Sequence, residues 1–177
     1  MDMKNPYVRL RELCGISQKA FAAKHGFGKM TMVYLESGMY TRVSDRQNIA
    51  LGKECGEKGV DAKRILEEEY SSSTLNEAYW KWRSFERREK APVVLAKAST
   101  QFSHVGDISP VAQLVAESTG SLQAFCKTLK IPSITMSRYI RGETATLPTE
   151  FREALIEAGY PFISQLEAAQ EKWRTRV

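Results

Sequence analysis

The sequence has few residues that could build a metal site or a disulfide framework. Of its 177 residues, three are cysteine and two are histidine. Cys14, Cys55 and Cys126 lie far apart and are odd in number, which favours reduced, partly buried thiols over a disulfide framework. These cysteines and histidines also lack the spacing typical of metal ligands. We therefore expect no metal and no other cofactor.

Long apolar runs and catalytic motifs are also missing. No apolar stretch approaches the roughly 18 residues that a membrane span needs, and the first six residues lack the apolar core of a secretory signal. The sequence contains no phosphate-binding glycine loop, nucleophile elbow or zinc-protease motif. It predicts a soluble, cytoplasmic protein that is not an enzyme and does not bind membranes.

Positive charge, by contrast, is concentrated in the first third of the chain. The whole sequence has 26 Lys and Arg against 21 Asp and Glu, a net charge of +5. Residues 1–60 contain 10 basic and 6 acidic side chains, residues 61–107 contain 8 of each, and residues 108–177 contain 8 and 7. A positively charged module attracts polyanions such as nucleic acid. The charge distribution therefore favours the first third as a polyanion-binding module.

Apolar residues recur at helical spacing along almost the whole chain, and no stretch alternates clearly enough to predict a strand. The sequence therefore predicts an all-α fold. We expect helices over residues 6–14, 17–24, 29–37, 45–57 and 61–70, then from 75 to about 90, and again from 110 to the carboxyl end with breaks near 120, 130, 142–147 and 159–161.

The helix that begins at Leu75 is expected to connect two helical modules. The pair Ala91-Pro92 should end it, because proline lacks the backbone N–H that a helix interior needs. Residues 93–95 could then form a short strand or a packed linker. The aromatic residues of this helix could stack on single-stranded nucleic acid, but their helical spacing favours core packing, with the basic residues on a solvated face. The core stripe would contain Leu75, Ala78, Tyr79, Trp82 and Phe85.

The second half of the chain repeats the first at an offset of 104 residues. Over residues 6–38 this offset gives eight identities in 33 positions, without a gap. Such self-similarity indicates two copies of one helical module. The identical pairs are Pro6 and Pro110, Leu10 and Leu114, Ser17 and Ser121, Ala20 and Ala124, Phe21 and Phe125, Thr31 and Thr135, Met32 and Met136, and Gly38 and Gly142.

Each copy has the spacing of a helix-turn-helix. In the first copy, Gly26 falls where the chain must turn sharply, and Phe27, Met32 and Leu35 form an inward stripe on the next helix. The segment from Ile16 to Gly38 resembles the Cro and phage-repressor family of DNA-binding domains over about 25 ungapped residues. The family pattern usually has Ser or Thr where this chain has Gly28, so one helix-capping hydrogen bond is expected to be missing.

This resemblance implies a set of DNA contacts in the first module. Gln18 would bind a phosphate, Thr41 and Arg42 would contact the backbone further along, and the second helix would enter the major groove. Met30 and Val33 cannot hydrogen-bond to bases but can pack on thymine methyl groups. The residues expected at this interface are Gln18, Gly28, Lys29, Met30, Thr31, Val33, Tyr34, Thr41 and Arg42.

The second module is more divergent. Leu122 replaces the phosphate-binding Gln, Lys130 replaces the turn Gly, and Ile140 replaces a Glu. Its outward residues are nevertheless better suited to DNA, since Arg138 could bind guanine through two hydrogen bonds. This module could instead serve only for association. Its expected DNA contacts are Ser133, Ile134, Thr135, Ser137, Arg138 and Arg141.

Together these features predict two helix-turn-helix domains, residues 1–70 and 108–177, joined by a connector helix and linker over residues 71–107. The resemblance implies a transcriptional regulator that binds double-stranded DNA sequence-specifically, with repression in a phage or mobile element as the leading role. Its two recognition helices would read unlike half-sites, and the protein would be a monomer or homodimer. A protein partner such as an antirepressor would relieve repression. The alternatives are a bipartite DNA-end or partition-site binding protein, and an antitoxin or adaptor that acts through protein partners.

Overall fold

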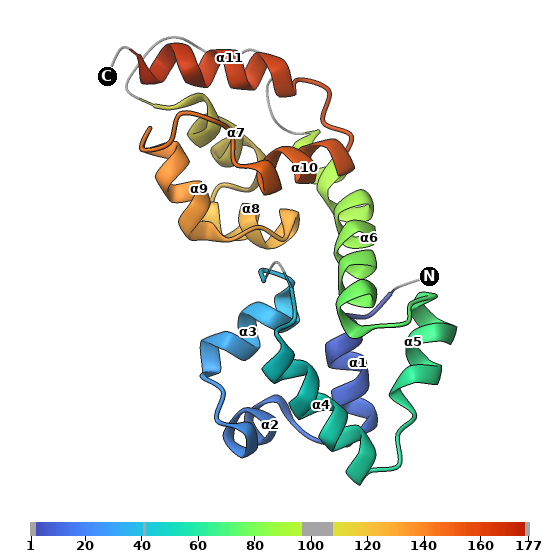
Figure 1. The fold of residues 1–177 in the computed structure, drawn as a ribbon. Coiled ribbons are helices and arrows are strands. Elements are labelled where there is room, and N and C mark those ends of the chain that lie inside the picture. The colour runs from blue at the N-terminus through green and yellow to red at the C-terminus, as the bar shows by residue number, and fades with distance from the viewer. Residues whose placement is uncertain (1–2, 41, 97–107, 176–177) are drawn as a thin grey trace. The chain divides into compact units, whose positions relative to one another are not determined.

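The computed structural model describes residues 3–40, 42–96 and 108–175, and within these ranges every regular element is an α-helix (Figure 1). This confirms the predicted all-α fold. The chain forms two compact units, residues 1–85 and residues 86–177, here called the N-terminal and C-terminal units. The division between the units falls within α6 (Leu75–Leu95), so this helix contributes to both. No helix among the described residues is long and apolar enough to cross a membrane.

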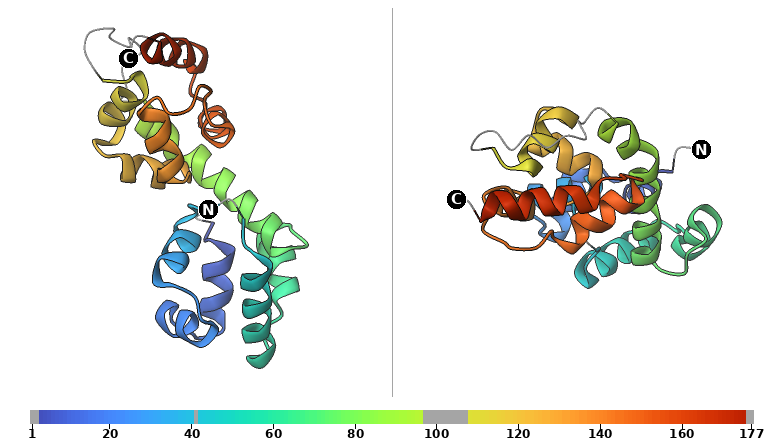
Figure 2. Two further views of the ribbon diagram at one scale, coloured as in Figure 1. Left: turned by 60° about the vertical axis from the view of Figure 1, so that its left-hand side comes forward. Right: turned by 90° about the horizontal axis from the view of Figure 1, so that it is seen from above.

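Five helices precede α6 in the N-terminal unit, and side-chain caps begin most of them. The Asn5 side chain accepts hydrogen bonds from the first turn of α1, Ser17 caps α2, and Ser44 forms a reciprocal capping box with Gln47 on α4. Helices α1 and α4 lie side by side in Figures 1 and 2. The helices are α1 (Pro6–Leu13), α2 (Gln18–His25), α3 (Lys29–Ser37), α4 (Asp45–Glu57) and α5 (Ala62–Tyr70).

All five helices and the first half of α6 contribute buried side chains to the core of the N-terminal unit. Tyr7, Phe21 and Leu35 are fully buried there, and the edge of the Tyr7 ring meets Phe21 at 5.7 Å between centroids. The Asn5 amide also donates to the carbonyl oxygen of Leu35 at 3.0 Å. Arg11 on α1 pairs with Glu36 on α3 at 2.8 Å. These contacts hold the end of α3 against both ends of α1.

The C-terminal unit repeats this order of helices. Helices α7, α8, α9 and α10 each begin 104 residues after α1, α2, α3 and α4. The offset found in the sequence over residues 6–38 thus extends to the fourth helix, where few residues are identical. The helices are α7 (Pro110–Thr119), α8 (Leu122–Leu129), α9 (Ser133–Ile140), α10 (Thr149–Glu157) and α11 (Ile163–Arg174).

Burial follows the same offset, because equivalent positions fill the same part of each core. The buried positions include the pairs Phe21 and Phe125, Met32 and Met136, Leu35 and Tyr139, and Leu51 and Leu155. Helix α11 completes the C-terminal core by contacting α7 and α10, with Leu166 and Ala169 buried.

The predicted end of the connector helix at Ala91-Pro92 is wrong. Helix α6 continues through Pro92 to Leu95, so residues 93–95 are helical and form neither the short strand nor the packed linker that the sequence suggested. Losing one backbone hydrogen bond at Pro92 is offset because Ala91 and Leu95, one helical turn apart, are both buried. The rest of the linker, residues 97–107, lies outside the described residues.

The expectation that the basic residues of α6 form a solvated face is wrong for Arg83 and Arg87, although Lys81 and Arg88 are exposed as expected. Arg83 and Arg87 are 0% and 1% exposed. The Arg83 guanidinium lies 4.6 Å from the centre of the Trp80 ring, and Arg87 is bound within the C-terminal unit. Of the expected core stripe, Ala78, Tyr79 and Trp82 are buried, whereas Leu75 and Phe85 are half-buried.

Candidate nucleic-acid interface

The turn between α2 and α3 is held by an arginine from α4. Gly26 adopts the left-handed conformation expected from the sequence, with φ of 64°. The Arg46 guanidinium donates to the carbonyl oxygens of His25 and Gly26 at 3.0 and 3.1 Å, and it lies over the Phe27 ring. Because these carbonyls end α2, their hydrogen bonds to Arg46 fix the direction in which α3 begins.

The equivalent turn in the C-terminal unit is held in a similar way from another helix. Lys130 takes the place of Gly26 and is also left-handed, with φ of 54°. Arg87 on α6 donates to the carbonyl oxygens of Leu129 and Lys130 at 2.8 and 3.3 Å, and to Glu157 at 2.8 Å. Left-handed backbone costs a residue other than glycine about 1 kcal/mol. The hydrogen bonds from Arg87 offset this cost.

Lys130 is also held through its side chain. Its ammonium lies 3.5 Å from the buried Glu86 carboxylate, which in turn pairs with Lys90 at 2.6 Å. Burial lowers the pKa of Lys130, whereas the Glu86 charge opposes that shift. The second half of α6 is thus bound to the turn between α8 and α9.

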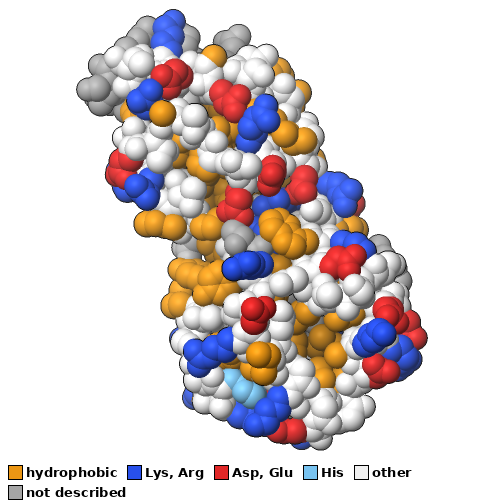
Figure 3. All heavy atoms as spheres, in the orientation of Figure 1, with side chains coloured by type: hydrophobic (Ala, Val, Ile, Leu, Met, Phe, Trp, Pro, Cys, Tyr) orange, Lys and Arg blue, Asp and Glu red, His pale blue; other side chains and the backbone are white. Residues whose placement is uncertain are grey.

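Helix α3 presents both polar and apolar side chains at the surface. Lys29, Met30 and Val33 are exposed, and Met30 is 53% accessible. Thr31 and Tyr34 are half-buried, and the Tyr34 ring meets the edge of Tyr40. Hydrophobic side chains are visible at the surface in the region of α3 (Figure 3). The first two turns of α3 therefore offer one ammonium group and a mainly apolar surface.

A hollow of about 370 Å³ lies where α3 and α4 begin. Gly28 precedes α3 and provides no side-chain cap, so the missing cap expected from the sequence is confirmed. The first N–H groups of α3 are thus open to an external acceptor, and helix N-termini favour anions. Arg42 and Arg46 add positive charge. The hollow is lined by Phe27, Gly28, Thr31, Tyr40, Arg42, Ser44, Arg46 and Gln47.

Gln18 and Thr41 are two further residues predicted to contact the DNA backbone. Gln18 is the first residue of α2 and is half-buried, and its side chain makes no hydrogen bond within the described part of the chain. It is therefore available for an external contact. Thr41 lies outside the described residues.

Helix α9 carries its exposed residues on a comparable face. Ile134 is 68% accessible and Arg138 is exposed, whereas Ser133, Thr135 and Ser137 are half-buried. The apolar Ile134 is the most exposed of these residues. The recognition surface expected on α9 is thus less polar than its sequence suggested.

Both predicted arginine contacts of the second module pair with Glu143. Arg138 donates from Nε to one oxygen of this carboxylate at 3.3 Å, and Arg141 donates to the other at 2.6 Å. These two cations lower the pKa of Glu143, with Arg141 the larger cause. Arg138 would have to exchange Glu143 for a base edge in order to read guanine.

Three residues that bear on this interface escaped the sequence analysis. Arg46 and Arg87 orient α3 and α9, but they lie 20 and 43 residues from the carbonyls of Gly26 and Lys130 that they bind, so no local pattern marks them. The pairing of Glu143 could have been predicted from the sequence, because this residue directly follows Gly142 after α9 and lies close in sequence to both arginines.

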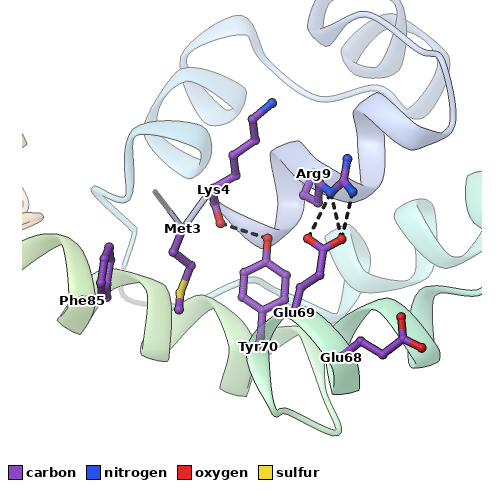
Figure 4. A pocket seen from close by; sticks show the side chains of 7 residues that line it. All are labelled: Met3, Lys4, Arg9, Glu68, Glu69, Tyr70 and Phe85. Carbon is purple, nitrogen blue, oxygen red and sulfur yellow. Dashed lines mark hydrogen bonds and ion pairs between the residues drawn. The ribbon is translucent and has the colours of Figure 1, made fainter. Parts of the chain in front are cut away.

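A larger hollow of about 540 Å³ in the N-terminal unit lies between the residues before α1 and α5 (Figure 4). Arg9 binds Glu69 through three hydrogen bonds of 2.9 to 3.1 Å. The Tyr70 hydroxyl donates to the Lys4 carbonyl at 2.9 Å. Because these polar groups already have partners, the hollow offers a ligand no unsatisfied hydrogen-bonding group among them. Its lining residues are Met3, Lys4, Arg9, Glu68, Glu69, Tyr70 and Phe85.

Comparison with protein-family models, curated proteins and solved structures finds no match to this chain.

Proposed function

We propose that this chain binds double-stranded DNA sequence-specifically through α3 and α9 and acts as a transcriptional regulator. The observation that carries the proposal is the repeated helix pair. Helices α2 and α8, and then α3 and α9, begin 104 residues apart, with a left-handed turn and an arginine-bound carbonyl pair in both units. The role of repressor in a phage or mobile element rests on the resemblance of residues 16–38 alone.

The two surfaces favour different DNA sequences. Met30 and Val33 on α3 offer apolar contact, which suits the methyl group of thymine in the major groove. Arg138 on α9 offers a guanidinium, which suits the O6 and N7 acceptors of guanine. One chain would therefore read two unlike half-sites. Gln18 and Arg42 would bind phosphates and add affinity without sequence preference.

Selection from random duplexes tests this proposal. The purified chain should enrich a long asymmetric site, and the affinities for this site and a scrambled site should then be compared over a salt titration. Arg138→Ala should cost about 1–3 kcal/mol on the selected site and relax preference at one base pair. Arg152→Ala is the matched control, because this exposed arginine on α10 pairs only with Glu167 among the residues described.

Binding that is equal on all duplexes and steeply dependent on salt would contradict sequence-specific recognition. A protein partner is the second candidate, favoured by the exposed apolar side chains of Met30, Val33 and Ile134. In that case Ile134→Asp should abolish a stable protein complex, while Arg138→Ala should leave the complex intact.

A further inference from the structure

Two thiols touch in the core of the N-terminal unit. The Sγ atoms of Cys14 and Cys55 are 3.5 Å apart, although 41 residues separate them in sequence. The two residues are only 3% and 2% exposed, so the partly buried thiols expected from the sequence are in fact buried. Cys14 follows the last residue of α1, and Cys55 lies in the last turn of α4. The thiols therefore face each other at two adjacent helix ends.

The shared fold does not require this pair. At the offset of 104 residues, the C-terminal unit has Ser118 and Gly159 in place of Cys14 and Cys55. Ser118 donates to the carbonyl oxygen of Leu114 within its own helix. The same helical arrangement thus forms with a hydroxyl at one position and no side chain at the other. The thiol pair is a specific property of the N-terminal unit.

The third cysteine provides an internal comparison. Cys126 on α8 is also fully buried, but it contacts no other thiol among the described residues. Burial raises its pKa to about 12. The pKa of Cys55 is likewise raised to about 12, chiefly by burial and then by its contact with Cys14. Cys55 and Cys126 therefore differ in having a thiol neighbour, not in their acidity.

The surrounding backbone allows the two sulfurs to come closer. A disulfide needs a sulfur–sulfur distance of about 2.05 Å, so the contact must shorten by roughly 1.5 Å. Gly15 and Gly56 follow the two cysteines, and a side-chain carbon at either glycine would meet nothing within 4 Å. The open space beside both glycines leaves room there for a small movement of the two helix ends.

We propose that Cys14 and Cys55 form an oxidation site that a peroxide converts to an intramolecular disulfide. One thiolate attacks hydrogen peroxide, the sulfur–oxygen bond forms as the oxygen–oxygen bond breaks, and the product is a sulfenic acid. The departing hydroxide takes up a proton and becomes water. The second thiol attacks the sulfenic sulfur, the sulfur–sulfur bond forms, and the oxygen leaves as a second water. In total, two thiols lose two protons and two electrons, and one peroxide takes them up and is reduced to two waters.

The bond would enclose residues 14–55, which contain α2 and α3. Cross-linking restricts the unfolded chain and so stabilises the N-terminal unit. None of the exposed residues of α3 is a cysteine or lies next to one in sequence. The inference therefore does not depend on the proposed DNA binding.

Mass spectrometry of the full chain tests the proposal. The folded protein is treated with hydrogen peroxide, remaining thiols are alkylated in denaturant, and the tryptic peptides are analysed. We expect one cross-linked species, lighter by two hydrogens, that joins the Cys14 and Cys55 peptides, with Cys126 alkylated. The same treatment in denaturant should give mixed pairs that include Cys126. Because the thiolate is the reactive form, the rate should rise several-fold for each unit of pH between about 7 and 9.

Cysteine variants test whether the cross-link depends on the contact between the Cys14 and Cys55 thiols or only on the reactivity of single cysteines. Cys126→Ser should leave cross-link formation unchanged, and Cys55→Ser should abolish it and leave Cys14 as a thiol or a higher oxide. The oxidised wild-type chain should unfold at higher urea concentration, and a reducing agent should reverse this shift. Two results would overturn the proposal: oxidation of all three cysteines at equal rates in the folded chain, or cross-links that form only between molecules. Both are measured on the wild-type chain, so neither requires that a variant folds.

Discussion

Arg46 and Arg87 bind the same pair of backbone carbonyls in their two units, although they come from different helices. Arg46 on α4 donates to the carbonyls of residues 25 and 26, and Arg87 on α6 donates to those of residues 129 and 130. The two arginines are not related by the offset of 104 residues, which pairs Arg46 with Glu150. A guanidinium suits this place because one planar group can satisfy two adjacent carbonyls that end a helix.

The two arginines should differ in their contribution to stability. Arg87 is 1% exposed, so Arg87→Ala leaves buried carbonyls without a donor and should lower the free energy of unfolding by about 3 kcal/mol. Arg46 is exposed, so water replaces it and Arg46→Ala should cost about 1 kcal/mol. Urea denaturation followed by circular dichroism measures both, with Arg152→Ala as an exposed control. Equal losses for the two variants would contradict the role of burial.

Gly142 should tolerate alanine less well than Gly120 does. Both glycines are left-handed, with φ of 75° and 72°, so alanine is strained by about 1 kcal/mol at either position. At Gly142 the added carbon would also lie 3.2 Å from the Trp173 ring, whereas at Gly120 it meets nothing within 4 Å. We expect Gly142→Ala to cost about 1 kcal/mol more than Gly120→Ala in thermal unfolding. Equal costs would mean that Trp173 moves aside freely.

The N-terminal unit should lose stability at acidic pH through Glu54. This carboxylate binds Lys24 at 2.6 Å and His25 at 2.7 Å, and the bond to Lys24 is the main cause of its lowered pKa. A carboxyl whose pKa is lowered by folding stabilises the protein above its ordinary pKa of 4.5, and this contribution is lost as the pH falls through the folded value. The urea concentration at the unfolding midpoint of the wild type should therefore decrease as the pH is lowered below about 4.5.

The variant Glu54→Gln isolates this effect. It should flatten the acidic limb of the curve, because the amide does not titrate. The neighbouring Glu57 also binds Lys24 and has a lowered pKa, but it is exposed. Glu57→Gln is therefore the matched control and should change the pH dependence less. An unchanged acidic limb in Glu54→Gln would show that other carboxyls dominate.

Glu143 should limit DNA binding by the C-terminal unit, if the proposed function holds. Because Glu143 pairs with both Arg138 and Arg141, Glu143→Gln should free both guanidinium groups, tighten binding several-fold and steepen its salt dependence. Glu153→Gln makes the same change of charge at an exposed residue of α10 and serves as the control. Equal effects of the two variants would indicate that only net charge matters.

Sequence alone determined the features that depend on neighbouring residues. Ser17 caps α2 and Gly26 ends it in a left-handed turn, because both effects act within one helical turn. The spacing of Phe21, Met32 and Leu35 marked the buried stripes, since a helix repeats every 3.6 residues. The offset of 104 residues predicted the repetition, and the equivalent starts of four helix pairs agree with it.

Tertiary structure decided the features that depend on residues distant in the chain. The contact of Cys14 with Cys55 and the burial of Arg87 arise from helices that meet only after folding. Helix α6 passes Pro92 because burial of Ala91 and Leu95 outweighs one lost hydrogen bond, a balance that local preference does not contain. Capping and helix periodicity act within a turn or two of the backbone, whereas partners across the core are chosen by packing of the whole unit.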